Sequence, residues 1–227
     1  MAEGDIQEGL IGVKHVIAVA SGKGGVGKST TAVNLALALS AAGNRVGIVD
    51  ADIYGPSLPL MLGVSENVRP EIVQEKFFAP LETLGLKSMS IGYLMTKDTP
   101  VVWRGPMASG ALLQILTQTI WGELDYLVVD MPPGTGDIQL TLAQKAQLSG
   151  AVIVTTPQDV ALLDARRAIE MFDKVNIPVL GIIENMAVHV CSQCGHHEHI
   201  FGKDGAQIVA SESFSYTLLT LPTNTSM

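Results

Sequence analysis

Residues 22–30 read Gly-Lys-Gly-Gly-Val-Gly-Lys-Ser-Thr and stand between a predicted strand and a predicted helix. They satisfy the pattern G-x-x-x-x-G-K-[ST], in which Gly22, Gly27, Lys28 and Ser29 hold the fixed positions. Glycines let such a loop curl until successive backbone N–H groups face an anion, and the helix N-terminus adds partial positive charge. Lys28 is then expected to contact the β- and γ-phosphates, and the Ser29 hydroxyl to ligate Mg²⁺. The stretch predicts a phosphate loop for a nucleoside triphosphate.

The same letters allow two other interpretations. Gly22, Gly24 and Gly27 also match the G-x-G-x-x-G fingerprint of dinucleotide-binding folds, with Asp50 at about the spacing of a ribose-binding acid. A glycine-rich turn without any ligand is the simplest alternative. Lys28 favours the triphosphate, because a dinucleotide site has no use for a lysine directed at a γ-phosphate.

The sequence around the loop predicts a doubly wound α/β fold. Apolar, non-alternating runs predict buried parallel strands at 16–20, 45–50, 124–130, 151–155 and 178–183. Helical stretches alternate with them at 29–42, 107–121, 138–148 and 160–175. This alternation predicts right-handed crossovers and a mostly parallel sheet with helices on both faces. We expect an N-terminal extension at 1–12, one P-loop domain at 13–210 and an atypical tail at 211–227, which is either truncated or altered, or contains a replacement edge strand at 216–221.

Composition excludes several classes of protein. Of the 227 residues 47% are hydrophobic and 16% charged, which suits a globular core, and the net charge of −8 argues against a general nucleic-acid binder. The longest apolar stretch, 32–42, contains Asn34 and Ser40, so we expect no membrane span. Residues 1–12 are acidic and resemble no targeting signal, which predicts a cytoplasmic, reducing setting.

Two segments carry weaker signals. Residues 68–93 are irregular and predict either a hairpin or an insertion. The tail is rich in Ser and Thr, and we expect at most a short strand at 216–221 in it.

Acidic residues follow two of the predicted strands. Asp130 ends an apolar strand in the manner of a Walker B aspartate, so we expect it to hold a magnesium-bound water. Residues 132–137 follow it and read Pro-Pro-Gly-Thr-Gly-Asp, with a backbone restricted by the prolines and then made flexible by the glycines. Such a segment suits a switch that senses the γ-phosphate. Asp52 lies just beyond the second strand, where it orients the attacking water, contacts Mg²⁺ through water, or caps the following turn.

Several motifs together resemble one family. The loop with its additional lysine is similar to the deviant Walker A of the MinD/ParA/nitrogenase-iron-protein class. The runs 50–59 (Asp-Ala-Asp-Ile-Tyr-Gly-Pro-Ser-Leu-Pro), 103–107 (Trp-Arg-Gly-Pro-Met) and 130–137 (Asp-Met-Pro-Pro-Gly-Thr-Gly-Asp) narrow the resemblance. With the Cys-x-x-Cys at 191–194, they resemble the Mrp/ApbC branch of iron–sulfur cluster carrier ATPases, over about residues 12–206.

The resemblance implies a homodimer with two facing MgATP sites, slow hydrolysis, and contacts with cluster donors and apo iron–sulfur client proteins. It implies that Lys23 reaches the partner's nucleotide and assists phosphoryl transfer together with Lys28, Asp52 and Asp130. It also places Asn185 against the adenine edge, although a turn or cap role fits an asparagine equally well. The implied ATP-binding residues of the loop are Gly22, Lys23, Gly24, Gly25, Val26, Gly27, Lys28, Ser29 and Thr30.

The cysteine pair lies in a predicted polar loop, 188–199, that also contains three histidines. A disulfide is unexpected in a reducing compartment, and a thioredoxin-type pair would need to start a helix. A mononuclear zinc site with two histidines is chemically feasible, although the histidines crowd close to Cys194. A 4Fe-4S cluster wants four thiolates, and a two-fold axis would supply Cys191 and Cys194 twice. The family implication agrees with the shared cluster, and zinc stays open.

The chain departs from the family pattern at both ends. Many bacterial members carry a small N-terminal domain, and members usually continue after the helix near Gly205 with a further strand and helix. Two other functions compete with a cluster carrier. A MinD/ParA-like positioning ATPase would need a basic tail or a basic surface stripe to bind membrane or DNA, and the absence of Lys and Arg from residues 211–227 counts against membrane targeting. An ATP-dependent ligase would need a substrate pocket, for which the sequence shows no signature.

Overall fold

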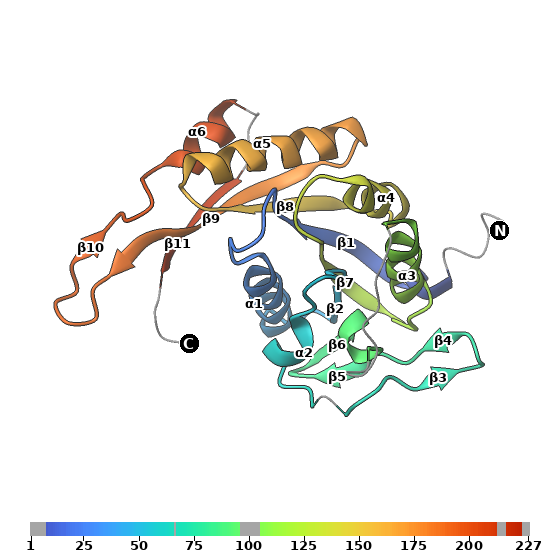
Figure 1. Cartoon of the computed structure of the whole chain (residues 1–227). Helices are drawn as coiled ribbons and strands as arrows, with labels where there is room; N and C mark the ends of the chain where they lie inside the picture. Colours follow the sequence, from blue (N-terminus) through green and yellow to red (C-terminus); the bar gives the residue numbers. More distant parts are fainter. Residues whose placement is uncertain (1–7, 66, 96–104, 213–216, 224–227) are drawn as a thin grey trace.

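The structure is a computed structural model that describes residues 8–65, 67–95, 105–212 and 217–223. Within these residues nine strands form one sheet, eight of them in the order β10-β9-β8-β1-β7-β2-β6-β5, while β11 pairs with β9 (Figure 1). The strands are β1 (Val13–Ala20), β2 (Val46–Asp50), β5 (Leu81–Thr83), β6 (Leu86–Ser90), β7 (Leu124–Asp130), β8 (Gly150–Thr155), β9 (Val179–Val190), β10 (His197–Glu198) and β11 (Thr217–Thr223). A separate two-stranded ribbon joins β3 (Ile72–Val73) to β4 (Phe77–Phe78).

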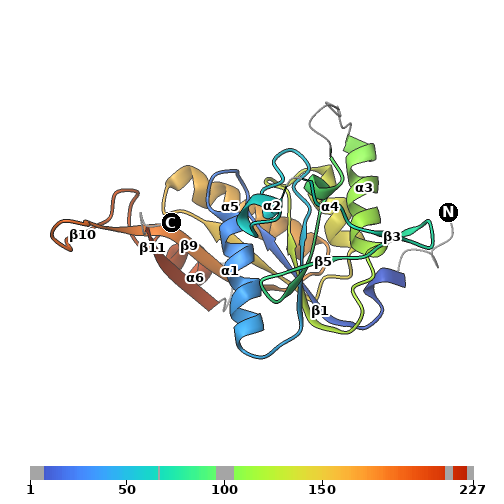
Figure 2. The same ribbon diagram turned by 90° about the horizontal axis from the view of Figure 1, so that it is seen from below.

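The predicted doubly wound architecture is confirmed. The central strands β8, β1, β7, β2 and β6 pair in parallel, and antiparallel pairs occur at β5–β6 and β10–β9. The helices are α1 (Lys28–Ala41), α2 (Leu58–Met61), α3 (Gly105–Thr117), α4 (Asp137–Lys145), α5 (Asp159–Lys174) and α6 (Gly205–Glu212). One apolar cluster packs α1 and α2 on one face of the sheet, and a larger one packs α3, α4, α5 and α6 on the other. Figures 1 and 2 show this sandwich from two directions.

The irregular segment 68–93 contains a strand of the main sheet that the sequence did not indicate. β6 pairs in parallel with β2, and β5 folds back on it as a hairpin. Leu86 and Met89 of β6 are fully buried. Because Lys87 and Ser88 stand between them, the sequence of β6 lacks the continuous apolar run by which the other strands are predicted. The hairpin interpretation of the segment is therefore correct but incomplete.

Helix α3 is shorter than the predicted helix 107–121, because the chain after Thr117 pairs with the ribbon. The backbone N–H of Phe78 donates to the carbonyl of Gln118, and the N–H of Ile120 donates to the carbonyl of Phe78. Trp121 is then fully buried as a core residue outside the helix, with its indole N–H bonded to the carbonyl of Leu116. A tertiary pairing thus ends a helix whose periodicity continues.

The predicted loop 188–199 is instead the end of a β-hairpin, which we call the arm. β9 runs to Val190, seven residues beyond the predicted strand end, and β10 pairs back on it. Figures 1 and 2 show the arm leaving the body of the molecule beyond β8. β11 pairs in parallel with β9 at the base of the arm, so the short strand expected in the tail is present at 217–223. None of the described helices is long and apolar enough to cross a membrane.

Candidate functional site

The glycine-rich loop lies at the carboxyl edge of the sheet, where β1 ends and α1 begins. Gly25 and Gly27 adopt left-handed backbone angles, with φ of +80° and +86°, which side-chain-bearing residues rarely adopt. No heavy atom lies within 4 Å of the position that a Cβ on Gly24 or Gly25 would occupy, so this part of the loop is open. The loop has the conformation of an anion nest at the start of a 14-residue helix.

Gly22 is needed for a different reason, because helix α5 packs directly on it. A Cβ at Gly22 would lie 2.1 Å from the backbone oxygen of Asp164, a distance that no real contact permits. We expect Gly22→Ala to lower the free energy of unfolding by about 1–3 kcal/mol, the usual cost of overpacking, and to displace the phosphate loop. Urea denaturation measures the loss, and Gly24→Ala is the matched control since a Cβ there meets nothing. Equal stability of the two variants would contradict this packing argument.

Lys28 and Asp130 form the buried centre of the site. The Lys28 ammonium bonds to the Asp130 carboxylate and lies 4.0 Å from Asp52 Oδ2. Asp130 is fully buried, and burial raises the pKa of its carboxyl group while Lys28 and a hydrogen bond from Ser29 lower it. Without a nucleotide, Lys28 therefore neutralises the acidic end of β7.

The residues fit a bound Mg²⁺. Asp130 Oδ2 is buried and, within the described residues, has no hydrogen-bond partner. An unpartnered carboxylate oxygen beside a serine hydroxyl is an oxygen donor set of the kind that magnesium prefers. Ser29 and Asp130, both predicted as magnesium residues, lie in contact.

Asp52 has the capping role that the sequence left open, and its role in orienting the attacking water stays a prediction. Its Oδ1 accepts a hydrogen bond from the N–H of Gly55 at 3.3 Å, which caps the turn after β2. Its other carboxylate oxygen faces Lys28. The side chain is 15% exposed, so it lies at the border between the buried ion pair and solvent.

Asp50 has a structural role that the sequence did not indicate. Its carboxylate accepts hydrogen bonds from the N–H groups of Asp52, Ser57 and Leu58 and from the Ser90 hydroxyl. It is fully buried, and burial, with the nearby Asp130 charge, raises its pKa to about 6. Since these bonds occupy both carboxylate oxygens, Asp50 holds the turn after β2 and does not serve as a ribose-binding acid.

Two further predicted residues contact the loop region within the same chain. Lys23 Nζ lies 3.4 Å from Gln158 Oε1, next to the start of α5. Asn185 Nδ2 donates to the carbonyl of Val26 at 3.0 Å, so it contacts the phosphate loop itself. The contact of Lys23 with a partner's nucleotide and that of Asn185 with adenine stay predictions. Gln158 was not foreseen, and no sequence signal marks it.

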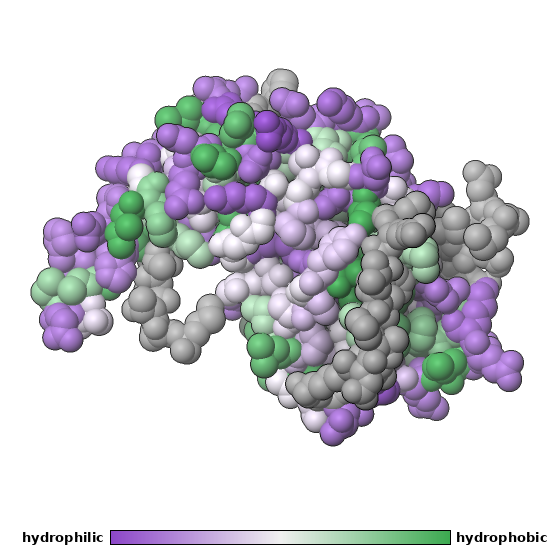
Figure 3. Space-filling model, in the orientation of Figure 1, coloured by the Kyte–Doolittle hydropathy of each residue, from purple (hydrophilic) through white to green (hydrophobic). Residues whose placement is uncertain are grey.

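The cysteine pair occupies the tip of the arm. Cys191 is half-buried and Cys194 exposed, and both are free thiols. Backbone N–H groups of Cys194 and Gln193 donate to the Cys191 sulfur, and they lower the pKa of this thiol. The thiolate is the form that binds metal. On the face that Figure 3 shows, hydrophilic and hydrophobic residues both lie along the arm.

The arm's histidines do not complete a metal site within one chain. The His199 ring nitrogen Nδ1 lies 2.7 Å from the carbonyl of Ala187, so this face of the ring is bonded to backbone. Among the described residues, no group of three or more His, Cys, Asp or Glu side chains is placed to hold a metal ion. A zinc site built from both cysteines and two histidines of the same chain is therefore not formed in this structure.

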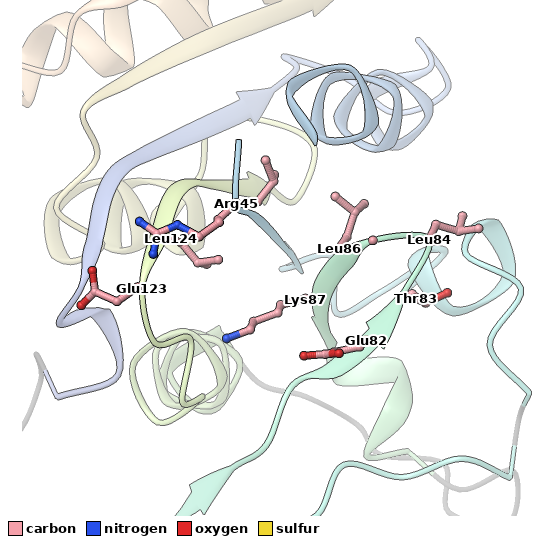
Figure 4. A pocket seen from close by; sticks show the side chains of 10 residues that line it. Arg45, Glu82, Thr83, Leu84, Leu86, Lys87, Glu123 and Leu124 are labelled. Atoms are coloured by element: carbon pink, nitrogen blue, oxygen red, sulfur yellow. The ribbon is translucent and has the colours of Figure 1, made fainter. Parts of the chain in front are cut away.

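A pocket of about 400 Å³ lies at the opposite edge of the sheet, where β2, β6 and β7 begin (Figure 4). Two basic and two acidic residues, Arg45, Lys87, Glu82 and Glu123, are among those that line it. Lys87 donates to the carbonyl of Trp121 at 2.7 Å, and Arg45 pairs with Asp125 at 3.3 Å. Both cations thus bind protein groups, and the pocket lies at the edge of the sheet opposite the phosphate loop.

The chain matches one protein-family model over most of its length. The model ParA, described as NUBPL iron-transfer P-loop NTPase, matches residues 12–227. The chain belongs to this family. The match also takes in residues 211–227, beyond the end at about residue 206 that the sequence resemblance suggested.

Several relatives with known names are closely similar to this chain. The iron–sulfur cluster carrier protein of Pseudomonas fragi is 64% identical over 214 residues, which are 94% of this chain and 75% of the relative. That of Escherichia coli (strain K12) is 62% identical over 221 residues, 97% of this chain and 60% of the relative. The iron–sulfur cluster transfer protein NUBPL of Mus musculus is 55% identical over 90% of this chain and 64% of its own length. The chain thus spans 60–75% of these relatives.

Solved structures place the NTPase in the same fold class. A nucleotide-binding protein from Archaeoglobus fulgidus, solved in complex with ADP, superimposes with a TM-score of 0.85 at 39% identity, covering 99% of this chain and 88% of the other. The cell division ATPase MinD of Pyrococcus furiosus gives a TM-score of 0.60 at 21% identity over 92% of this chain and 84% of its own. The MinD likeness shows the shared fold.

Proposed function

We propose that this P-loop NTPase binds MgATP, hydrolyses it slowly, and carries an iron–sulfur cluster held between two copies of the chain for transfer to apo-proteins. One observation carries the proposal: the arm presents two free thiols on a P-loop fold, and no further metal-binding side chain of the described chain joins them. The names of the relatives support the same cargo. Free thiols suit a reducing cytoplasm, which we propose as its location.

The phosphate chemistry falls to residues around the loop. The backbone N–H groups of residues 24–29 would hold the β- and γ-phosphates, and Lys28 would exchange its bond with Asp130 for the phosphate oxygens. Mg²⁺ would neutralise charge on those oxygens, held by Ser29 and, through water, by Asp130. Asp52 would orient the attacking water, and Lys23 would leave Gln158 to stabilise charge on the partner's nucleotide.

The cargo chemistry falls to the arms of two chains. Two arms related by a two-fold axis bring together four thiols, the number that a cubane cluster requires. The lowered pKa of Cys191 favours the thiolate before the cluster arrives. The exposure of Cys194 leaves the cluster accessible to an acceptor protein, as delivery requires.

Anaerobic reconstitution tests the carrier function. We expect about four iron and four sulfide per dimer, as a 4Fe-4S cluster requires, with brown colour that disappears in the Cys191→Ser, Cys194→Ser double variant. These two residues are the chain's only cysteines, so the double variant contains no thiol. Ser192→Ala, in the same turn, is the matched control and should retain the colour. Tight zinc binding without any uptake of iron and sulfide would favour the zinc alternative and overturn the proposal.

A further inference from the structure

Strand β9 is interrupted between the body of the protein and the arm. Its pairing with β8 ends where Glu184 faces Thr155. Its register with β11 shifts at the same place, because Thr220 faces Glu184 whereas Pro222 faces Val188. Three residues of β9, Asn185, Met186 and Ala187, therefore oppose one residue of β11, and we call them the bulge.

The bulge contains an unusual backbone conformation. Met186 has a φ of +58°, and among the described non-glycine residues with positive φ it is the one that lies inside a strand. The others lie in turns or beside helix ends. A left-handed residue in a strand costs free energy, and such residues persist where the surrounding structure holds them. The bulge is thus a strained joint at the base of the arm, five residues before Cys191.

One hydrogen bond connects this joint to the phosphate loop. Asn185 Nδ2 donates to the carbonyl of Val26, and the same nitrogen would lie 2.2 Å from a Cβ placed on Gly27. The carbonyl of Val26 and the N–H of Gly27 belong to one planar trans peptide, in which the two groups point in opposite directions. A donor on the carbonyl side therefore directs the Gly27 N–H to the other side of the peptide, as the nest requires.

The neighbouring residue ties the joint to the other end of the arm. Glu184 is almost fully buried, and its Oε2 accepts a hydrogen bond from the N–H of Ala206 at 2.5 Å, at the start of α6. The arm leaves β9 directly after the bulge, and the chain then returns to α6. One end of the arm is therefore continuous with the bulge. The helix that follows its other end is bonded to Glu184, the residue before Asn185. The bulge region is thus hydrogen-bonded to the phosphate loop through Asn185 and to the start of α6 through Glu184.

We propose that Asn185 is a positioning residue that couples occupancy of the phosphate loop to the cysteine arm. This inference rests on the proposed function. An anion that accepts the Gly27 N–H polarises the peptide, which strengthens the bond from Asn185 to the Val26 carbonyl, since hydrogen bonds in a chain reinforce one another. A stronger bond holds the bulge more firmly and makes the arm less mobile, so triphosphate binding orders the thiols.

Hydrogen exchange of the cluster-free protein tests the coupling. We expect saturating Mg²⁺–ATP to slow exchange of backbone amides in residues 185–199 by about two- to tenfold, the equilibrium shift that one hydrogen bond provides. Magnesium tripolyphosphate, which has no base, should produce the same slowing, and this separates the coupling from any contact of Asn185 with adenine. Calorimetry on each variant establishes saturation.

Two variants and one control decide the outcome. In Asn185→Ala the slowing should disappear while tripolyphosphate still binds. Met186→Gly keeps the Asn185 bond but relaxes the joint, so the arm should exchange faster without ligand. Asn34→Ala removes a comparable amide-to-carbonyl bond, to Thr30 on the exposed side of α1, and should respond like the unaltered chain.

Failure of this coupling is distinguishable from failure of the carrier function. An arm that ignores tripolyphosphate in the unaltered chain, or an Asn185→Ala variant that responds fully, overturns the coupling. Neither result depends on a cluster, because all of these measurements use protein without one. Failure of reconstitution would overturn the carrier function and leave the exchange experiment valid.

Discussion

Lys28→Ala is expected to reduce ATP hydrolysis by about 10²- to 10³-fold, the usual effect of removing one preorganised group that stabilises transition-state charge. Lys28 is the cation at the start of α1 that lies among the acidic groups of the site, with its side chain 7% exposed. The backbone N–H groups of the loop remain in the variant, so nucleotide still binds, with lower affinity. Single-turnover hydrolysis with a radiolabelled γ-phosphate measures the loss directly.

The same variant is also expected to be less stable without nucleotide, by about 3–5 kcal/mol, the range for removing one partner of a buried ion pair. The reason is that Asp130 is buried and relies on Lys28 for compensation of its charge. Lys145→Ala is the matched control, because Lys145 is an exposed lysine near the end of α4. Unchanged urea denaturation of Lys28→Ala would show that the pair with Asp130 contributes little to the fold.

The sequence predicts the centre of this protein better than its periphery. β1, β7 and β8 contain the apolar, non-alternating runs 16–20, 127–129 and 151–154, because both faces of the sheet are covered there, and this pattern is visible without any structure. β6 also pairs in parallel with β2 inside the sheet. However, Lys87 near its amino end is only partly buried and donates to the carbonyl of Trp121. A local pattern cannot reveal a cation that is satisfied by a residue 34 positions away.

The candidate site divides in the same way. Lys28, Ser29 and Asp130 are fixed by a local motif and by the shared edge of parallel strands, and the structure places them in contact. The bonds of Lys23 with Gln158 and of Asn185 with Val26 join residues 135 and 159 positions apart in the chain. Such contacts depend on how α5 and β9 pack against the loop, and no spacing in the sequence specifies them.

Asp50→Ala is expected to unfold the protein or to cost at least about 4 kcal/mol, because three backbone N–H groups and the Ser90 hydroxyl lose their acceptor in a buried place. Asp50→Asn is the informative variant. It keeps one oxygen acceptor but sets an amide N–H₂ against one of the donors, and we expect a cost of about 1–3 kcal/mol at pH 7. Chemical denaturation in metal-free buffer measures both variants.

The pH dependence separates the charge of Asp50 from its hydrogen bonds. Burial raises the pKa of this carboxyl from 3.8 to about 6 in the folded protein, so between these values the folded state binds more protons than the unfolded state. Stability therefore falls as the pH rises through this window, by about 3 kcal/mol for a shift of about two pKa units. Asp50→Asn has no proton to lose, so the stability advantage of the unaltered chain over the variant should be largest near pH 4 and smaller at pH 7. An advantage that instead grows with pH would mean that the Asp50 charge is stabilised by its four donors and by Lys28 by more than its burial costs.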